Sequence, residues 1–418
     1  MLIEIGLGMV ATSGITYYKY RNYIKENRMF NNCCKLKNKN FHILNTTIND
    51  YGTEFIISLK DKEFKDLESL KDLLYNNFKG DVEIEQNKNS TATIKIIKNE
   101  IGGHFVPLKL KAHEIYLGLD NHYEPIIVNM NSYPHVLITG STGSGKTQEL
   151  KLLLTNLIYS NSERDINIHF SNISESNDFK EFLGCIQVKS YMEKIEESLK
   201  LFEYINHLYS KRLEIFKKYN VTDIKEYNKK YQNKKMSYQY LILDEFADYY
   251  PNNKLEEDYN IKVQCYNILK HLVRKARKAG IFIILALQRS DNESMDASLK
   301  SNINTKIGFS QNNNPSSLVI TGDYSLTGLE PRKFVTIYGS NKIWSKSLYI
   351  DDSMIKKYVN NSICKHTLNT FLEPNRAIQK DNKVIDIKKK TIKKKKDEVA
   401  VSRVKNIEVI ELKQGKNV

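Results

Sequence analysis

The stretch VLITGSTGSGKTQELKLLL, Val136–Leu154, is an apolar run that breaks into a glycine-rich loop and resumes with helix-forming residues. The loop has the Gly-x-x-x-x-Gly-Lys-Ser/Thr spacing of a P-loop, with a strand expected over Val136–Thr139 and a helix over Gln148–Leu154. In such a loop the backbone N–H groups turn inward around a β-phosphate, and the following helix points its positive end at the same group. The residues expected to bind the nucleotide are Gly140, Ser141, Thr142, Gly143, Ser144, Gly145, Lys146 and Thr147.

Two side chains of this loop have chemistry of their own. Lys146 is expected to reach the β- and γ-phosphate oxygens, and the hydroxyl of Thr147 to hold Mg²⁺. The alternative is an ordinary Gly/Ser turn before a helix. We favour the P-loop, because the strand and the helix that the motif requires flank it on both sides.

A second motif, YQYLILDEFAD, covers Tyr238–Asp248. It is an apolar strand that ends in two acids, as in a Walker B motif. Asp244 is expected to bind Mg²⁺, and Glu245 to orient and deprotonate the attacking water. A hydrophobic strand that ends at a solvated acidic turn is the alternative. The P-loop upstream favours the catalytic interpretation.

The segment RKARKAG, Arg274–Gly280, leads into an apolar strand over Ile281–Leu287, and Gln288 follows it. A glutamine at the end of a strand beside the Walker B strand is placed to sense a γ-phosphate. Arg277 is a candidate arginine finger for a neighbouring subunit's nucleotide. Basic residues at a helix end also complement the helix dipole, and the residues alone do not separate these two roles for Arg277.

Composition adds weaker constraints. The 418-residue chain carries 64 Lys+Arg against 49 Asp+Glu, a formal charge of +15, which suits a polyanionic partner such as nucleic acid or an acidic membrane face. Its five cysteines form no Cys-x-x-Cys or zinc spacing, which suits a reducing cytosol. No His-Glu-x-x-His motif is present, so a metalloprotease is not expected.

Two units are expected before the P-loop. Residues 2–18 are mostly apolar and precede a basic flank that extends to residue 28. They favour one membrane span over a buried or interfacial helix, although Glu4 argues for the latter. Residues 41–118 are expected to form a small α/β accessory domain of β-α-β-β type, with a strand at Thr53–Leu59, a helix through Phe64–Phe78 and two more strands.

From Ile115 onward, strands and helices alternate, which predicts an α/β domain over residues 119–352 with a mostly parallel sheet covered on both faces. A hairpin is expected around Asp120–His122 and a polar surface excursion over Val221–Gln232. Further strands are expected at 166–170 and 187–191, and helices at 192–219 and 256–278.

The order of these motifs resembles the FtsK/SpoIIIE branch of the FtsK/HerA DNA-pumping ATPases. GSTGSGKT is followed by YLILDEFAD, KARKAGIFIILALQRS and LKSNINTKIGF, and the resemblance covers most of residues 115–352. It implies a RecA-like P-loop motor that uses ATP and Mg²⁺, forms a homohexameric ring and drives double-stranded DNA through its centre. It also implies that Arg277 is the family's trans-acting arginine and Gln288 its sensor glutamine.

Three features depart from the family pattern. Ser171, Asn172 and Ile173 replace a frequent Asp-Pro-Lys, and Lys306 stands where arginine is usual. Instead of a winged-helix module that reads DNA sequence, a polar, lysine-rich tail is expected over residues 353–418. Its run Lys388–Lys396 either holds phosphates or is solvated and disordered. Together with the short anchor, this organisation is most similar to the TcpA-type coupling proteins of Gram-positive mobile elements.

These features favour an ATP-dependent double-stranded DNA translocase at the cytoplasmic face of the cell membrane. It would act as a coupling protein in conjugative DNA transfer, with a relaxase and transfer-channel proteins as partners. A motor for chromosome or plasmid segregation is the first alternative. The second is a membrane adaptor that uses nucleotide binding to recruit a DNA-processing complex. Glu245 argues against the adaptor, because an adaptor needs no catalytic base.

Overall fold

The computed structural model describes residues 20–99, 103–173, 177–288 and 295–372. The apolar segment 2–18, expected to span a membrane, and the lysine-rich run 388–396 lie outside the described residues. Within the described ranges, no helix combines the length and the apolar character that crossing a bilayer requires.

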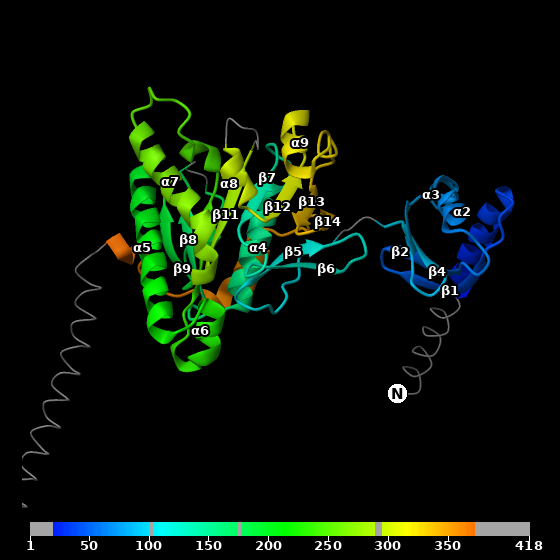
Figure 1. The fold of residues 1–418 in the computed structure, drawn as a ribbon, viewed down its shortest axis with the longest axis horizontal. Helices are drawn as coiled ribbons and strands as arrows, with labels where there is room; N and C mark the ends of the chain where they lie inside the picture. Colours follow the sequence, from blue (N-terminus) through cyan, green and yellow to red (C-terminus); the bar gives the residue numbers. More distant parts are fainter. Residues whose placement is uncertain (1–19, 100–102, 174–176, 289–294, 373–418) are drawn as a thin grey trace, which may run out of the picture.

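The N-terminal domain is a four-stranded antiparallel sheet in the order β1-β2-β4-β3, with helices packed against it (Figure 1). Its elements are β1 (His42–Asn49), β2 (Gly52–Ser58), α2 (Phe64–Glu68), α3 (Lys71–Phe78), β3 (Asp81–Gln86) and β4 (Thr91–Ile97). The expected β-α-β-β unit is present, but β1 precedes it. This edge strand lacks the alternation of buried and exposed residues that marks β2 and β4, so the sequence pattern does not reveal it.

A helix at residues 20–36 belongs to this domain and overlaps the expected basic flank of the anchor. Phe30 stacks on Phe55 of β2 with 5.1 Å between ring centroids, and Cys33 and Cys34 are buried in the same core. Phe78 of α3 contacts Phe55 edge-on. The small sheet is therefore stabilised by apolar residues from two separate helical segments.

The structure also moves the boundary between the domains. Residues 104–118, expected in the accessory domain, pack instead on the P-loop domain, where Phe105 and Ile115 are fully buried. Here β5 (Glu114–Leu119) pairs with β6 (Pro125–Asn129) and packs against the helix after the P-loop. The expected hairpin turn joins β5 to β6, and the Asp120 carboxylate accepts hydrogen bonds from two backbone N–H groups of that turn.

The P-loop domain is built on an eight-stranded sheet in the order β14-β13-β12-β7-β11-β10-β8-β9. Its strands are β7 (Val136–Thr139), β8 (Ile166–Ser171), β9 (Val188–Met192), β10 (Tyr238–Leu243), β11 (Ile281–Leu287), β12 (Thr305–Phe309), β13 (Lys333–Tyr338) and β14 (Asn341–Lys346). The strands from β12 to β9 pair in parallel, and β13 and β14 add an antiparallel hairpin. The mostly parallel sheet predicted from the sequence is confirmed.

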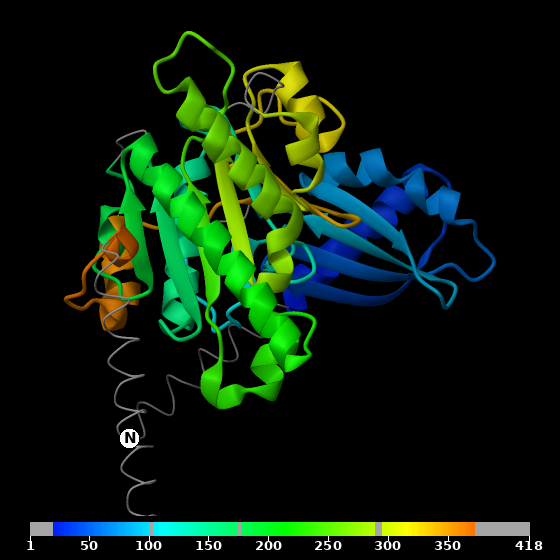
Figure 2. The same cartoon turned by 60° about the vertical axis from the view of Figure 1, so that its left-hand side comes forward.

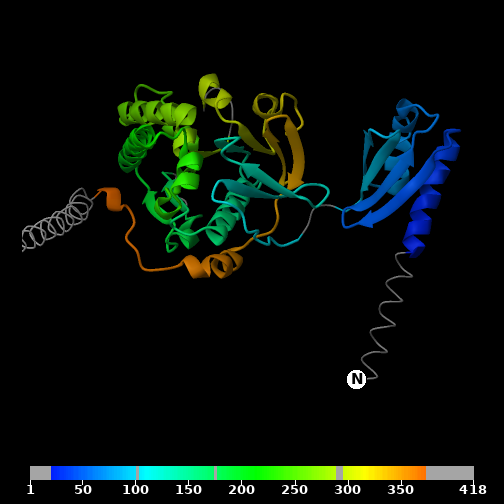
Figure 3. The same ribbon diagram turned by 60° about the horizontal axis from the view of Figure 1, so that its bottom comes forward.

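Helices cover both faces of this sheet, as Figures 2 and 3 show. One face carries the paired helices α5 and α7, and the other carries α4 with α10. The helices are α4 (Lys146–Ser160), α5 (Ile195–Tyr219), α6 (Ile224–Lys230), α7 (Tyr259–Lys275), α8 (Ala297–Ser301), α9 (Asn314–Thr321) and α10 (Asp352–Val359). β10 and β11 are buried along their whole length, as expected for strands covered on both sides.

Two segments differ from expectation. The expected surface excursion 221–232 contains α6, whose Ile224 and Tyr227 are buried. Residues 353–372, expected in the tail, pack on the P-loop domain, with Ile355 and Val359 of α10 buried. Because Ile355 and Val359 are four residues apart, they lie on one face of the helix, and a segment that is polar on average still has an apolar side.

The two domains meet at the β5–β6 turn. His122 of that turn lies 2.9 Å from Glu83 of β3 through Nε2 and contacts the ring of Tyr51 edge-on at 5.1 Å between centroids. Asp120, and then Glu83, raise the pKa of the His122 imidazole to about 9. The charged histidine therefore connects a carboxylate of each domain.

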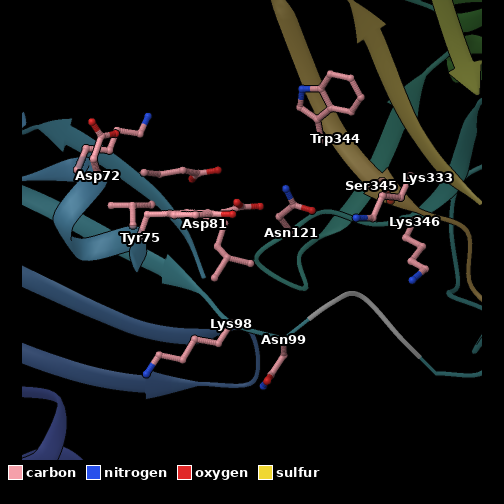
Figure 4. A pocket seen from close by; sticks show the side chains of 14 residues that line it. Asp72, Tyr75, Asp81, Lys98, Asn99, Asn121, Lys333, Trp344, Ser345 and Lys346 are labelled. Carbon is pink, nitrogen blue, oxygen red and sulfur yellow. The ribbon is translucent and has the colours of Figure 1, made fainter. Parts of the chain in front are cut away.

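Beside this contact lies a cavity of about 510 Å³ (Figure 4). Asp72, Tyr75 and Lys98 line it from the accessory domain, and Trp344 and Lys346 line it from β14. The meeting point of the two domains is thus only partly packed, and His122 supplies a direct ionic contact across it.

We expect this contact to weaken as pH rises. A histidine whose pKa is raised in the docked state stabilises that state fully below about pH 6.5 and loses this contribution as pH rises through about 9. Small-angle scattering should therefore show a larger radius of gyration at pH 9.5 than at pH 6.5. The His122→Gln variant should show the larger radius of gyration at both pH values. The exposed His42→Gln is the control, and pH-independent dimensions of the unmodified chain would contradict the assignment.

Candidate active site

The P-loop turns between β7 and α4, and glycines give it its shape. Gly145, immediately before the helix, has φ +116°, and a Cβ there would approach the Cα of Arg332 to 3.2 Å. A Cβ on Gly140 would stand 2.6 Å from the Cβ of Phe309. Both positions therefore require glycine, for backbone conformation at Gly145 and for space at Gly140.

Neighbouring strands fix the loop through its backbone. The N–H of Gly140 donates to the carbonyl of Leu287 at 3.2 Å, and the N–H of Ser141 donates to that of Ser310 at 2.9 Å. The N–H of Arg332 donates to the carbonyl of Ser144 at 2.8 Å. The loop is therefore held by the ends of β11 and β12 and by the residue before β13.

The expected nucleotide residues line one pocket of about 420 Å³ at the carboxyl end of the parallel strands. It is lined by Gly140, Ser141, Thr142, Gly143, Gly145, Lys146, Thr147, Gln148, Asp178, Asp244, Glu245 and Gln288. Of the predicted loop residues only Ser144 is absent from the lining, because its side chain is buried behind the loop. The structure thus brings the P-loop, the Walker B acids and Gln288 together.

Within the pocket, Glu245 is the central side chain. Lys146 Nζ lies 3.3 Å from Glu245 Oε2, and the backbone N–H of Gln288 donates to Glu245 Oε1 at 3.3 Å. Thr142 Oγ1 donates to the side-chain oxygen of Gln288 at 3.4 Å. Glu245 has φ +53°, an unusual conformation for a residue with a side chain, which is typical of functional sites.

The acidic side of the pocket suits a hard cation. Burial raises the pKa of Asp244 above its usual value, while the Lys146 ammonium lowers it. Glu245 and Asp178 raise it further by like-charge repulsion. Mg²⁺ prefers oxygen ligands, so the hydroxyl of Thr147 and the carboxylate of Asp244 are suited to hold it.

Asp178 is a site residue that the sequence did not reveal. It lies after β8 in the segment that leads to the short 3-10 helix Lys180–Phe182, and no fixed spacing marks it. Only the parallel pairing of β8 with β10 brings its carboxylate near Asp244. The only sequence signal for Asp178 was its place in the loop after a strand, since loops that follow the strands of a parallel sheet meet at its carboxyl edge.

Arg277 does not join this pocket. It lies in the 3-10 turn Ala276–Ala279, before the first residue of β11, whereas Gln288 follows the last residue of the same strand. A strand of this length separates them by about 20 Å at roughly 3.3 Å per residue. Within one chain, Arg277 therefore cannot reach the nucleotide pocket.

The departures from the family pattern have structural roles. Ser171 is fully buried, and its hydroxyl lies 2.6 Å from the hydroxyls of both Ser198 and Tyr249, which connects β8, α5 and the turn after Glu245. Asn172 donates to the hydroxyl of Tyr191 at 2.8 Å. Lys306 lies on β12 away from the pocket, and burial lowers its pKa. None of the three lines the nucleotide pocket.

A buried acid lies directly behind the P-loop. Glu149, in the first turn of α4, is fully buried, and its Oε2 accepts a hydrogen bond of 2.6 Å from Ser347 Oγ. Its Oε1 has no hydrogen-bond partner among the described residues, and burial raises its pKa to about 8. Ser347 also accepts, through its carbonyl, a hydrogen bond from the Arg332 guanidinium. The segment after β14 thus supports the loop through a neutral carboxyl group.

We expect Glu149 to lower the stability of the fold as pH rises. In the unfolded chain the carboxyl ionises near pH 4.5, whereas in the fold it stays protonated to about pH 8. Its contribution to the free energy of unfolding therefore falls between these values, by at most about 1.4 kcal/mol per pH unit. In urea unfolding, the free energy of unfolding of Glu149→Gln relative to that of the unmodified chain should rise steadily from pH 5 to pH 8. The exposed Glu68→Gln should not, and parallel curves for both would contradict the burial argument.

Comparisons with known proteins show what this chain is similar to. Residues 109–291 match the model of the FtsK/SpoIIIE family. DNA translocase FtsK of Caldanaerobacter subterraneus subsp. tengcongensis is 26% identical over 252 residues, which cover 59% of this chain and 34% of that protein. DNA translocase SftA of Bacillus subtilis is 24% identical over 257 residues, which cover 58% of this chain and 25% of that protein. The chain spans about a third or less of the length of these relatives.

Solved structures share the fold. The conjugation coupling protein TcpA of pCW3, solved as a monomer with ATPγS, matches with a TM-score of 0.57 and 19% identity over 81% of this chain and 99% of that chain. The cytoplasmic domain of the Thermomonospora curvata type VII secretion ATPase EccC matches with a TM-score of 0.52 and 19% identity. The match covers 63% of this chain and 32% of that chain. The resemblance drawn from the motifs is confirmed: residues 109–291 match the FtsK/SpoIIIE family model, and the chain shares the fold of the P-loop ATPases TcpA and EccC.

Proposed function

We propose that this chain is an ATP-dependent double-stranded DNA translocase that acts as a coupling protein in conjugative DNA transfer. The observation that carries the proposal is the division of the hydrolytic residues between two edges of one sheet. Lys146, Glu245 and Gln288 meet in one pocket, whereas Arg277 lies at the opposite edge. A motor that closes into a ring uses this arrangement, because the arginine of one subunit completes the site of the next.

The proposed roles follow from the contacts. Lys146 neutralises the β- and γ-phosphate oxygens of ATP, and Glu245 orients the attacking water and takes its proton. Thr147 and Asp244 are the residues that would hold Mg²⁺, which would supply positive charge beside the phosphates. Gln288 connects Glu245 with Thr142 of the P-loop, so it is placed to report the presence of the γ-phosphate to both.

Similarity supports the substrate and the setting. The curated relatives FtsK and SftA are named DNA translocases, and the TcpA structure corresponds to most of this chain, including residues outside the motor. The formal charge of +15 suits a polyanion. We place the protein at the cytoplasmic face of the membrane, anchored through residues 2–18, with a relaxase and transfer-channel proteins as partners.

A segregation motor is the second candidate, since several of the matching curated relatives are FtsK proteins. Deletion of the gene separates the two roles. Loss of transfer with normal division and plasmid inheritance supports coupling, and the reverse supports segregation.

Lys146→Ala tests the proposed function. Without the ammonium group, the phosphates lose their main cationic partner, so we expect DNA-stimulated ATP turnover and conjugative transfer to fall together by about 100-fold or more. Lys200→Ala, an exposed lysine of α5, is the control and should retain both. Transfer at normal frequency by the Lys146→Ala protein would reject the proposal.

The trans role of Arg277 has its own test. Lys146→Ala and Arg277→Ala should each be inactive, but mixing them should restore turnover. An intact P-loop then faces an intact arginine at roughly a quarter of the interfaces in a random equal mixture. Lys278→Ala, the neighbouring residue, should remain active alone. A mixture as inactive as its components would show that Arg277 does not complete a neighbour's site.

A further inference from the structure

A second pocket, of about 590 Å³, lies at the edge of the sheet opposite the nucleotide site. We call it the α6 pocket, because α6, at the bottom of Figure 1, forms one wall. Its floor includes Ala112, His113, Met236 and Tyr238, with the rings of His113 and Tyr238 5.6 Å apart. Burial lowers the pKa of His113, so this ring is neutral at pH 7 and the floor is uncharged.

The rim of the α6 pocket is strongly basic. The cationic residues that line it are Lys111, Arg164, Lys225, Lys229 and Lys235. They come from the segment before β5, the turn before β8, α6, and the loop before β10. The acid that lines the pocket, Asp165, is already engaged, because its carboxylate accepts hydrogen bonds from the N–H and the hydroxyl of Ser162.

Few acids compensate these cations. Lys111 lies 3.6 Å from Glu114 and Lys225 lies 3.8 Å from Asp223, both at the long end of the ion-pair range. Among the residues that the structure describes, Arg164, Lys229 and Lys235 have no ion-pair partner. The rim therefore keeps a net positive charge that is available to a ligand.

The pocket is built into the fold. The Asn228 side chain donates to the carbonyl of Met236 at 2.9 Å and accepts from its N–H at 2.8 Å, which fixes α6 to the loop before β10. Buried Arg212 donates to the carbonyl of Ser237 at 2.7 Å and to that of Ala279 at 2.5 Å. These contacts hold the walls in place, so the spacing of the cations on them is set by the fold.

Arg212 also connects the α6 pocket with the Arg277 turn, because Ala279 belongs to that turn. Arg274, Lys275 and Lys278 lie around the same turn and line an adjoining pocket whose described lining contains no acid. Positive charge therefore continues along the amino-terminal edge of the parallel strands. This makes the edge suited to a ligand with several phosphates.

We propose that the α6 pocket binds the phosphate backbone of duplex DNA, away from the nucleotide site. This inference rests on the proposed function and adds a contact surface to it. The cations are mostly lysines on exposed chains, which neutralise phosphates without reading sequence. No glycine among the described residues lines this pocket, so it lacks the glycine-rich loop of the P-loop and does not suit a second nucleotide site.

An anionic membrane surface fits this pocket less well. Binding to a bilayer surface combines positive charge with apolar side chains that enter the lipid. None of the large, exposed apolar side chains of the described residues lines the α6 pocket, and its surface is concave. Phosphates of a duplex can approach such a basic hollow without any apolar insertion.

The test is the double charge reversal Lys229→Glu with Lys235→Glu in the full chain. Binding of a fluorescent 50-base-pair duplex, a length of about five helical turns, is measured at several salt concentrations. We expect the dissociation constant to rise about tenfold or more and the slope of log K against log salt to fall by about two. The reversal of Lys60 and Lys62, two exposed lysines of the accessory domain, changes the net charge equally and should leave both nearly unchanged.

Further outcomes make the test decisive. Lys229→Ala with Lys235→Ala should show an intermediate loss, since attraction is removed without adding repulsion. ATPγS binding should be equal in all variants. Unchanged duplex affinity and salt slope in the charge-reversal variant would overturn the inference. Binding of the same variant to vesicles of anionic phospholipid is measured in parallel, and a loss of vesicle binding without a loss of duplex binding would also overturn it. If the unmodified chain itself neither binds nor moves DNA, the proposed function fails instead.

Discussion

The parallel pairing of β7, β11 and β10 is the constraint on which the site depends. In this register Thr139 lies beside Leu287, and Leu243 beside Leu285, so the residues that follow these strands emerge at one edge. The loops after them carry the P-loop, Gln288 and Glu245. Because every strand in this centre is buried on both faces, a shift by one residue would disrupt its packing against both helix layers, so the groups that follow the strands keep their spacing.

The P-loop is also held from the carboxyl-terminal side of the chain. Arg332 contacts the loop carbonyl of Ser144, Ser347 binds the buried carboxyl of Glu149, and Gln148 donates to the carbonyl of Ile350. These contacts surround the β13–β14 hairpin, whose outer strand lines the cavity shared with the accessory domain. The β13–β14 hairpin therefore lies between the residues that hold the P-loop and the cavity beside the accessory domain.

The two edges of the sheet carry different chemistry. The carboxyl edge gathers acids beside the P-loop, whereas the amino edge carries Arg277 and the basic α6 pocket. Buried Arg212 stands between the starts of β10 and β11 and donates to carbonyl groups, so it stabilises the amino edge without using up an acid. One chain thus carries an acidic nucleotide pocket at one edge and a set of cations at the other, and the proposed function rests on this separation.

The sequence by itself determined the P-loop, the Walker B strand, Gln288 and the mostly parallel character of the sheet, because fixed spacing, continuous apolar runs and the alternation of strands with helices report local structure directly. Tertiary structure alone decided the rest. Asp178 and Glu149 carry no spacing signal, and their roles come from long-range packing against Asp244 and Ser347. β1 was not predicted, because this exposed edge strand lacks the alternation of buried and exposed residues. α6 was not predicted, although Asp223 caps it by accepting a hydrogen bond from the Glu226 N–H, because its few apolar residues become informative only against the surface they cover.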